Sequence, residues 1–394
     1  MRAASQALIL LALATPARAA DGGAAGPRWV DEWDVAAYVE VYLTYNNQGA
    51  PRGAVDFESQ NSGIVTANHP LGPGRFTARG QFSLEPATLR PEGSPQLAQW
   101  GEVQDGVLQV DSRRPKNFFM EAGADWVTNL ATHTQLRLYA APVGEATLGP
   151  VPYVRRLSAM ENPEAPLSAT LQEGSSVAEG VLSAGLKSGS GDQRSFQVEG
   201  SLFHGREPDA EHWDLAPGVL DSWAVRLTAK PYTGVVASLS RGHLVAPFRG
   251  LPGDWDRTCF TLSGERLYKQ SLVAATVVWA RNSMPGQRLD SFLAEALYSW
   301  NLFSFFGRYE RLDRPGLLGP SQPVGLESPR VVAVTAGVVH ELPLAGGWKT
   351  GLGTDVVFHG MPDVYAASYG RYPTSFHVFL RIRSEGRRAR PQLE

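Results

Sequence analysis

The sequence predicts an all-β transmembrane protein, an antiparallel up-and-down β-barrel of about 16 strands, with roughly 14 to 18 as the range. Three observations predict this fold. Many segments alternate apolar and polar residues, the links between them alternate between short and long, and the chain opens with an export signal. A strand that has lipid on one face and water on the other alternates in this way, because successive side chains point to opposite faces.

The clearest strand covers residues 75–85. Phe76 and Phe82 fall on one face, whereas the charged Arg79 and Glu85 fall on the other and must meet water. The predicted strands cover residues 38–45, 61–68, 74–85, 117–127, 133–142, 176–187, 193–204, 220–230, 232–242, 258–268, 271–282, 290–300, 302–311, 330–341, 347–358 and 374–383.

The links after even-numbered strands are tight and rich in turn residues, and those after odd-numbered strands are mostly long. The tight links are residues 69–73, 188–192, 231–232 and 342–346. The long links are residues 46–60, 86–116, 143–175, 205–219, 312–329 and 359–373. Outer-membrane barrels have short periplasmic turns and long external loops, so we expect both termini in the periplasm. Residues 86–116 and 143–175 are long enough to fold inward and narrow the lumen.

The first residues predict export, because Arg2 precedes the apolar run ALILLALA and residues 17–19 read A-R-A, a cleavage pattern. We therefore expect a signal peptide at residues 1–19 and a periplasmic segment at 20–37. The barrel then covers residues 38–383, and residues 384–394 form a basic, disordered tail. No later run approaches the roughly 20 apolar residues of a transmembrane helix. The predicted location is the outer membrane of a Gram-negative bacterium, as an integral protein.

Composition and charge limit the classes of partner that we expect for this protein. A net charge of −3 gives no reason to expect nucleic acid binding, and the single Cys259 cannot form an internal disulfide. Tyr298, Trp300, Phe303 and Phe305 cluster at one predicted turn, where aromatic side chains anchor a barrel at the lipid boundary. The expected partners are outer-membrane lipid, the barrel-assembly machinery during biogenesis and small polar solutes.

The predicted inward faces carry many charges, and these are the candidate lumen-lining residues that could set selectivity. They are Glu40, Arg79, Glu85, Glu121, Arg137, Glu179, Glu199, Arg226, Glu295, Arg308, Glu310, Asp355 and Arg381. Neighbouring strands supply opposite signs. Such charges fit an aqueous pore, which barrels of about 16–18 strands usually enclose. They also fit a filled interior, in which the loops plug the lumen and the barrel serves a binding or structural role.

Several segments resemble a family of largely uncharacterised bacterial outer-membrane barrel proteins with a G-R-E-P-D loop signature. These segments are residues 41–53 (VYLTYNNQGAPRG), 67–72 (ANHPLG), 82–89 (FSLEPATL), 140–150 (AAPVGEATLGP), 160–167 (MENPEAPL), 197–208 (QVEGSLFHGREP) and 220–227 (LDSWAVRL). The resemblance runs from about Tyr42 to the last strand. Its most specific part is the loop motif, formed by Gly205, Arg206, Glu207, Pro208 and Asp209, with the D-S-W strand that follows.

The resemblance also implies histidine-rich stretches and a loose association with metal efflux, and this chain departs from it there. Residues 111–117 read DSRRPKN and residues 168–176 read SATLQEGSS, without histidine. We therefore expect no cofactor and no transition-metal site. Glu207, Asp209, Glu211 and Asp214 lie in one segment and form a weak calcium candidate. The alternative is a structured loop in which Arg206 pairs with a carboxylate.

An enzymatic function is not expected. Ser375, His377 and Arg381 share the inward face of the last predicted strand, but the sequence contains no hydrolase, metalloprotease or phosphate-binding motif. The primary hypothesis is therefore passive, porin-like diffusion of small polar solutes. A loop-plugged barrel associated with an efflux or surface assembly is the alternative, and an outer-membrane hydrolase comes third.

Overall fold

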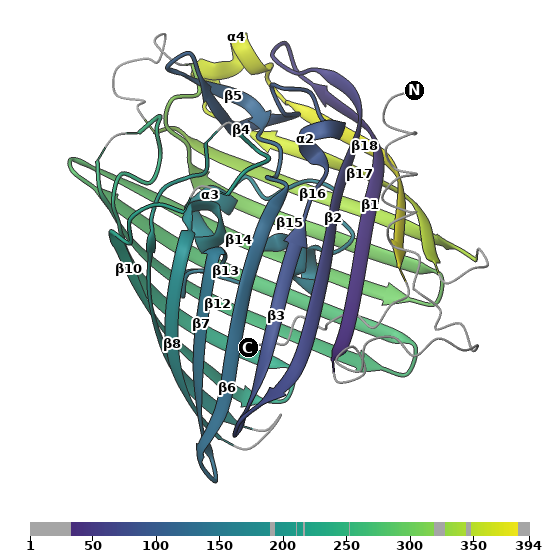
Figure 1. Ribbon diagram of the computed structural model, residues 1–394. Coiled ribbons are helices and arrows are strands. Elements are labelled where there is room, and N and C mark those ends of the chain that lie inside the picture. Colours follow the sequence, from purple (N-terminus) through teal and green to yellow (C-terminus); the bar gives the residue numbers. More distant parts are fainter. Residues whose placement is uncertain are drawn as a thin grey trace.

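The computed structural model describes residues 33–189, 194–209, 211–215, 217–251, 253–318, 328–343 and 348–384. The predicted signal peptide and residues 385–394 of the predicted tail lie outside this part of the chain. In the described part, sixteen antiparallel strands close into one barrel, and a separate two-stranded sheet lies at one end of it (Figure 1). The predicted fold class is confirmed.

The strands of the barrel follow one another around the wall almost in chain order. They are β1 (Asp34–Gly49), β2 (Val55–Leu71), β3 (Gly74–Phe82), β6 (Phe119–Ala131), β7 (Thr134–Val143), β8 (Glu179–Gly189), β9 (Ser195–His204), β10 (Ser222–Tyr232), β11 (Val235–Leu244), β12 (Trp255–Tyr268), β13 (Ser271–Met284), β14 (Gln287–Trp300), β15 (Phe303–Asp313), β16 (Arg330–Leu342), β17 (Trp348–Gly360) and β18 (Thr374–Ser384).

The remaining elements lie in the links. The separate sheet is the hairpin β4 (Ser94–Gln104) and β5 (Val107–Arg113), which the sequence analysis did not predict. The short helices are α2 (Glu85–Thr88), α3 (Ala169–Gln172) and α4 (Ala366–Tyr369), and 3-10 turns occur at Tyr153–Arg155, Leu157–Ala159, Gly174–Val177 and Asp363–Tyr365. In Figure 1, α2, β4, β5 and α4 gather at the upper end of the barrel, opposite the short turns.

The barrel closes because β1 pairs with both β2 and β18. Tyr42 lies opposite Gln60 on one side and opposite Arg381 on the other. Closure matters in lipid, where an unpaired strand edge would leave backbone groups without hydrogen-bond partners.

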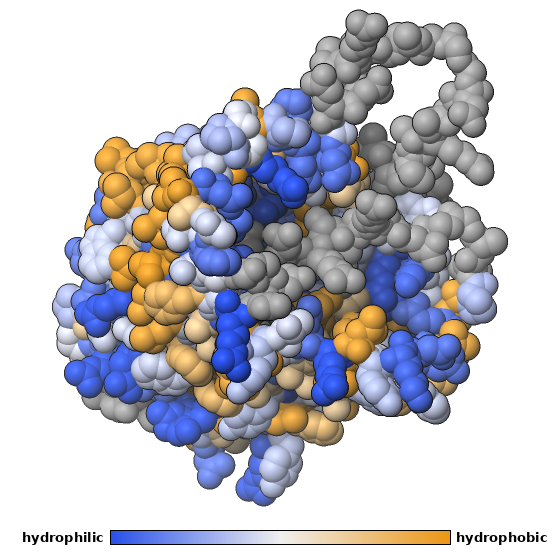
Figure 2. Space-filling view, turned by 90° about the horizontal axis from the view of Figure 1, so that it is seen from below, coloured by the Kyte–Doolittle hydropathy of each residue, from blue (hydrophilic) through white to orange (hydrophobic). Residues whose placement is uncertain are grey.

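The period-two pattern puts apolar side chains outside and polar ones inside. On β10, Trp223, Val225 and Leu227 are exposed on the outer surface, whereas Ser222 and Thr228 are buried in the interior. Tyr298, Trp300, Phe303 and Phe305, the predicted aromatic anchors, are also exposed. Seen from below, apolar side chains form a patch along one side of the molecule, and hydrophilic side chains are mixed with apolar ones over the rest of this face (Figure 2).

All sixteen predicted strands correspond to barrel strands, but some boundaries were wrong. β1 begins at Asp34, inside the segment predicted as periplasmic, and runs to Gly49, while β2 begins at Val55. The predicted long link 46–60 is therefore mostly strand. Its polar residues hid this, because both faces of β1 and β2 are polar there. No helix in the described residues is long and apolar enough to cross a membrane.

Candidate functional site

The link between β7 and β8, residues 144–178, folds into the barrel and is called the inner loop below. Its side chains Leu148, Leu167 and Leu171 are almost completely buried. Thr147 N donates to Ser201 Oγ on β9 at 3.0 Å, and Gly149 N donates to Ser240 Oγ on β11 at 2.9 Å. These contacts begin a series that continues around the wall of the barrel.

Ion pairs fix the inner loop to distant strands. Arg155 Nη1 lies 3.2 Å from Glu121 Oε2 on β6, and Arg156 Nε lies 2.7 Å from Glu295 Oε1 on β14. Glu161 pairs with Arg381 on β18. Because β6, β14 and β18 are separated around the wall, the loop crosses the lumen rather than lying along one side of it.

Backbone groups of the inner loop also bind inward side chains of the wall. Glu310 accepts hydrogen bonds from Ser168 N at 2.9 Å and from Ser168 Oγ at 2.7 Å. Arg257 Nη2 donates to Thr170 O at 2.8 Å, and Asn282 Nδ2 donates to Leu171 O at 2.9 Å. The wall therefore supplies donors and acceptors to loop backbone that would otherwise be buried without partners.

A buried polar cluster joins the inner loop to β1, β2, β17 and β18. His377 Nδ1 lies 2.6 Å from Asp355 Oδ1, and its Nε2 lies 3.2 Å from Glu164 Oε1 of the loop. Asn46 Nδ2 donates to Glu58 Oε1 at 3.0 Å and approaches Glu164 Oε1 at 3.5 Å. Carboxylates from the wall and the loop thus meet around one imidazole and one amide.

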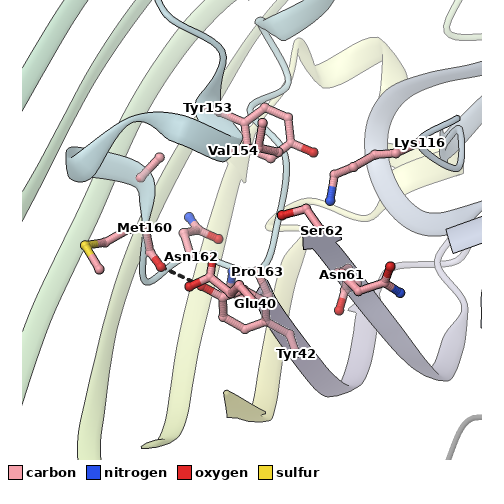
Figure 3. A pocket seen from close by; sticks show the side chains of 12 residues that line it. Glu40, Tyr42, Asn61, Ser62, Lys116, Tyr153, Val154, Met160, Asn162 and Pro163 are labelled. Atoms are coloured by element: carbon pink, nitrogen blue, oxygen red, sulfur yellow. Dashed lines mark hydrogen bonds between the residues drawn. The ribbon is translucent and has the colours of Figure 1, made fainter. Parts of the chain in front are cut away.

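A small pocket lies between the β1–β2 wall and the inner loop (Figure 3). Glu40, Tyr42 and Ser62 line it from the wall, and Tyr153 and Asn162 from the loop. The Tyr42 hydroxyl donates to Met160 O at 2.5 Å, which bridges wall and loop beside the pocket. The pocket has a volume of about 30 Å³. Since one water needs roughly 10–15 Å³ of such space, the pocket has room for about two waters.

The link between β3 and β6, residues 83–118, is called the outer loop and covers the pocket end of the barrel. Glu85, the first residue of α2, lies 2.8 Å from Arg113 Nη1 and 2.7 Å from Lys116 Nζ. Burial alone would raise the pKa of Glu85, but Arg113 and Lys116 outweigh burial and lower the pKa to about 2. Lys116 also borders the pocket.

The structure buries most of the predicted lumen residues. Glu40, Glu121, Glu179, Glu199, Glu295, Arg308, Glu310, Asp355 and Arg381 are buried on barrel strands, and Arg79, Arg137 and Arg226 are partly buried. Glu85 was misplaced: β3 ends at Phe82, and Glu85 belongs to α2 in the outer loop. Pro86 ends the alternation because proline cannot continue a central strand.

Two predicted charge pairs form across neighbouring strands. Glu199 Oε2 lies 2.9 Å from Arg226 Nη2, and Glu295 Oε2 lies 3.3 Å from Arg308 Nε. Arg137 extends the first pair by contacting both Asp125 and Glu199. A ladder of alternating charge therefore runs along this part of the wall, and the role of these residues in selectivity stays a prediction.

The external-loop motif is ordered by contacts other than those expected. Gly205 N donates to Asp221 Oδ1 at 3.2 Å, and Glu207 Oε1 accepts from Arg249 N at 2.9 Å. Arg206 is exposed and makes no ion pair with any residue that the structure describes. Among the residues that the structure describes, the expected pairing of Arg206 with a carboxylate does not form, and backbone donors order the motif.

The calcium candidate is not assembled. Asp209 Oδ1 accepts from Glu211 N at 2.9 Å, while Glu211 and Asp214 are exposed. Within the described ranges, which include Glu207, Asp209, Glu211 and Asp214, no three His, Cys, Asp or Glu side chains are placed to hold a metal ion. His212 instead contacts Asn117 Oδ1 at 2.9 Å and Glu102 Oε1 at 3.0 Å.

Ser375, His377 and Arg381 do share the inward face of β18, where all three are fully buried. Ser375 Oγ donates to Gln48 Oε1 at 2.8 Å, and His377 contacts Asp355, Glu164 and neighbouring amides. These contacts describe a structural network rather than a hydroxyl activated by a histidine.

Sequence reasoning missed the residues that hold the inner loop in place. Arg156, Glu161 and Glu164 lie in a segment without periodicity, so nothing in the sequence showed which wall residues they meet. The wall residue Arg257 was also missed. Its position on the inward face of β12 was a usable signal, because a buried arginine needs acceptors from another segment.

Several solved structures of bacterial outer-membrane proteins are similar to this chain. An anion-selective porin from Comamonas acidovorans is similar with a TM-score of 0.52 at 12% identity, over 90% of this chain and 99% of that chain. A loop L8 deletion mutant of OmpT, an outer membrane protein of Vibrio cholerae, gives 0.49 at 11% identity, over 90% and 100% of the chains. A BenF-like porin from Pseudomonas fluorescens Pf-5 gives 0.46 at 7% identity, over 90% and 98%.

Sequence comparison adds nothing to this. No protein-family model matches the chain, and no curated protein matches it. The resemblance to barrels with the G-R-E-P-D signature therefore stays a prediction. The similarity to the Comamonas porin, together with the closed barrel and its apolar outer surface, establishes the fold. The chain has the fold of a porin-like barrel of the bacterial outer membrane.

Proposed function

We propose that this protein is a porin-like channel through which ions and small polar solutes diffuse passively, and that the docked inner loop limits their size. The observation that carries this proposal is the inner loop itself, held across a charged lumen by Glu121, Glu295 and Arg381. A barrel of sixteen strands encloses an aqueous space unless something fills it. The loop fills much of that space.

The charge ladder on the wall supports the same proposal. Arg79, Arg137 and Arg226 retain partly exposed side chains inside the barrel, at 17%, 20% and 17%. Their carboxylate partners are almost fully buried. Water therefore reaches one side of the ladder, which gives a polar surface along which small hydrated solutes can pass. The anion selectivity of the Comamonas porin does not transfer to this chain at 12% identity.

The second candidate is a barrel whose lumen stays plugged, with a binding or structural role in an efflux or surface assembly. It is favoured by the size of the pocket beside Tyr42, which accepts about two waters. In either case we propose that both termini face the periplasm, because the short turns lie at that end of the barrel. A catalytic function has no support from the contacts of Ser375 and His377.

Recording from the purified protein in planar lipid bilayers separates the two candidates. The porin-like function predicts stepwise conductance in KCl that persists at low voltage, together with swelling of liposomes in small sugars but not in large ones. The plugged barrel predicts no channel steps over the same range of voltage and salt, and that result would remove the proposal.

A further inference from the structure

The carboxylates of the lumen are not spread evenly around the wall. Glu40, Glu58, Glu341 and Asp355 project from β1, β2, β16 and β17, and the inner loop adds Glu161 and Glu164. We call these six residues the acidic sector. The basic groups that pair with them are Arg381, Arg383 and His377. When His377 is counted as protonated, the six acids of this described group outnumber its three bases by three.

Three carboxylate oxygens of the acidic sector are buried without a hydrogen-bond partner among the described residues. They are Glu58 Oε2, Glu164 Oε2 and Asp355 Oδ2. The three residues are only 1%, 4% and 4% exposed, respectively. A buried carboxylate oxygen without a donor is unfavourable, and a nearby cation or hydrated cation relieves that cost whereas an anion increases it.

The pocket lies against this sector, because Glu40 belongs to both. Lys116, on the other side of the pocket, offsets only part of this excess. Its ammonium lies 2.7 Å from Glu85, which also pairs with Arg113, so these three residues leave one positive charge. The ladder elsewhere on the wall balances Arg79, Arg137 and Arg226 against three carboxylates. Two acids therefore remain in excess around the pocket among the described residues, and the field there is negative.

We propose that the channel favours small cations over anions, and that Glu40, Glu58 and Glu164 set this preference. The inference rests on the proposed channel function and deepens it by naming the class of solute. A low-dielectric wall focuses the field of uncompensated charges into the narrow part of a channel, which raises the local concentration of ions of opposite sign. Inorganic monovalent cations and small organic ammonium ions are the expected solutes.

The test is the reversal potential of the wild-type channel across a KCl gradient, which gives the permeability ratio of potassium to chloride. At about 0.1 M salt we expect potassium to be favoured at least about threefold. The preference shrinks near 1 M, because the screening length falls from about 10 Å to about 3 Å. A purely structural role of these carboxylates would give no such dependence on salt.

Substitutions test which residues cause the preference for cations. Glu40→Gln is expected to lower the permeability ratio about twofold, and Glu40→Lys to lower it further. Glu58→Gln is a second, independent change in the same direction. Glu211→Gln is the matched control, since Glu211 is an exposed carboxylate of the link 205–221. It should leave the ratio unchanged.

Each outcome of these measurements supports or overturns a stated part of the proposal. Channels that prefer chloride, or that show no preference at low salt, would overturn the cation inference while leaving the channel function intact. An unchanged ratio in a folded Glu40→Gln channel would overturn the assignment to the acidic sector. If no channels form, the proposed function fails and this inference falls with it. The wild-type measurement decides even where a variant does not fold.

Discussion

Arg156 and Glu295 are 139 residues apart in the chain, yet Arg156 Nε donates to Glu295 Oε1 at 2.7 Å inside the barrel. Arg156 also lies 2.7 Å from Glu173 at the far end of the inner loop. One guanidinium therefore joins the loop to the wall and also to a later part of the same loop. Both side chains are almost fully buried, so water cannot replace either partner.

Replacing Arg156 with methionine should release the inner loop, because Glu295 and Glu173 would each lose a buried partner. Breaking a buried pair by removing one member costs about 3–5 kcal/mol, and here the cost applies to docking of the loop. We expect faster hydrogen exchange across residues 151–168 in detergent. Arg241→Met is the control, since Arg241 belongs to an exposed pair with Asp256 and exposed pairs contribute about 0–1 kcal/mol. Equal exchange in both variants would contradict the account.

Gly205→Ala tests the external-loop motif. A β-carbon at Gly205 would overlap the side chain of Ser222, and Ser222 Oγ also accepts the hydrogen bond from Val245 N at 3.0 Å. We expect a loss of about 1–3 kcal/mol in the stability of the link 205–221, seen as new protease cleavage there. Gly200→Ala is the control, because its β-carbon would meet nothing closer than 3.8 Å. Resistance of Gly205→Ala to protease would show that Ser222 moves aside.

Docking of the outer loop should depend on pH through Glu85. Its pKa is lowered to about 2 in the folded protein, against an ordinary value of 4.5. A depressed pKa contributes stability that is present above the unfolded value, and this stability is lost as the pH falls from about 4.5 toward 2. The shift corresponds to about 3 kcal/mol.

Hydrogen exchange of residues 94–113, measured from about pH 6 down to pH 2 and corrected for the intrinsic rate, checks this prediction. Protection should fall through the acid range in the wild type. In Glu85→Gln it should be low throughout and independent of pH. A pH profile identical in the two proteins would remove Glu85 as the titrating group.

Zinc and copper should not bind tightly to the purified barrel. A transition-metal site needs several converging histidine or cysteine ligands, whereas Cys259 is buried on β12 and His212 is engaged by Glu102 and Asn117. Calorimetric titration should show no stoichiometric binding at micromolar metal. Stoichiometric binding that disappears in His212→Ala would mean that this histidine leaves its present partners to bind metal.

The barrel could be predicted from the sequence because lipid and water impose a period of two on each strand. On β10, Trp223, Val225 and Leu227 alternate with Ser222 and Ala224, and no other segment is needed to interpret that pattern. The prediction failed around Asn46 and Glu58, because consecutive polar residues at 46–48 and 58–62 interrupt the alternation there.

Only part of the site could be predicted from the sequence. The wall charges Glu295 and Arg308 were identified, because their inward direction follows from strand periodicity. Their partners Arg156 and Glu164 were not, because a loop without regular structure gives no signal of which wall residue each side chain meets. That the loop could turn inward followed from its length. The position of the loop inside the barrel depends on tertiary contacts such as those of Arg257 and Asn282.

The central claim is that the docked inner loop restricts a channel that is otherwise open. The most direct test compares single-channel conductance in KCl for the wild type and for a chain in which residues 151–170 are replaced by a short Gly-Ser linker. The account predicts small conductance steps in the wild type and steps several-fold larger in the shortened chain, with passage of larger sugars into liposomes. Equal conductance in the two proteins, with both folded as heat-modifiable barrels, would contradict it.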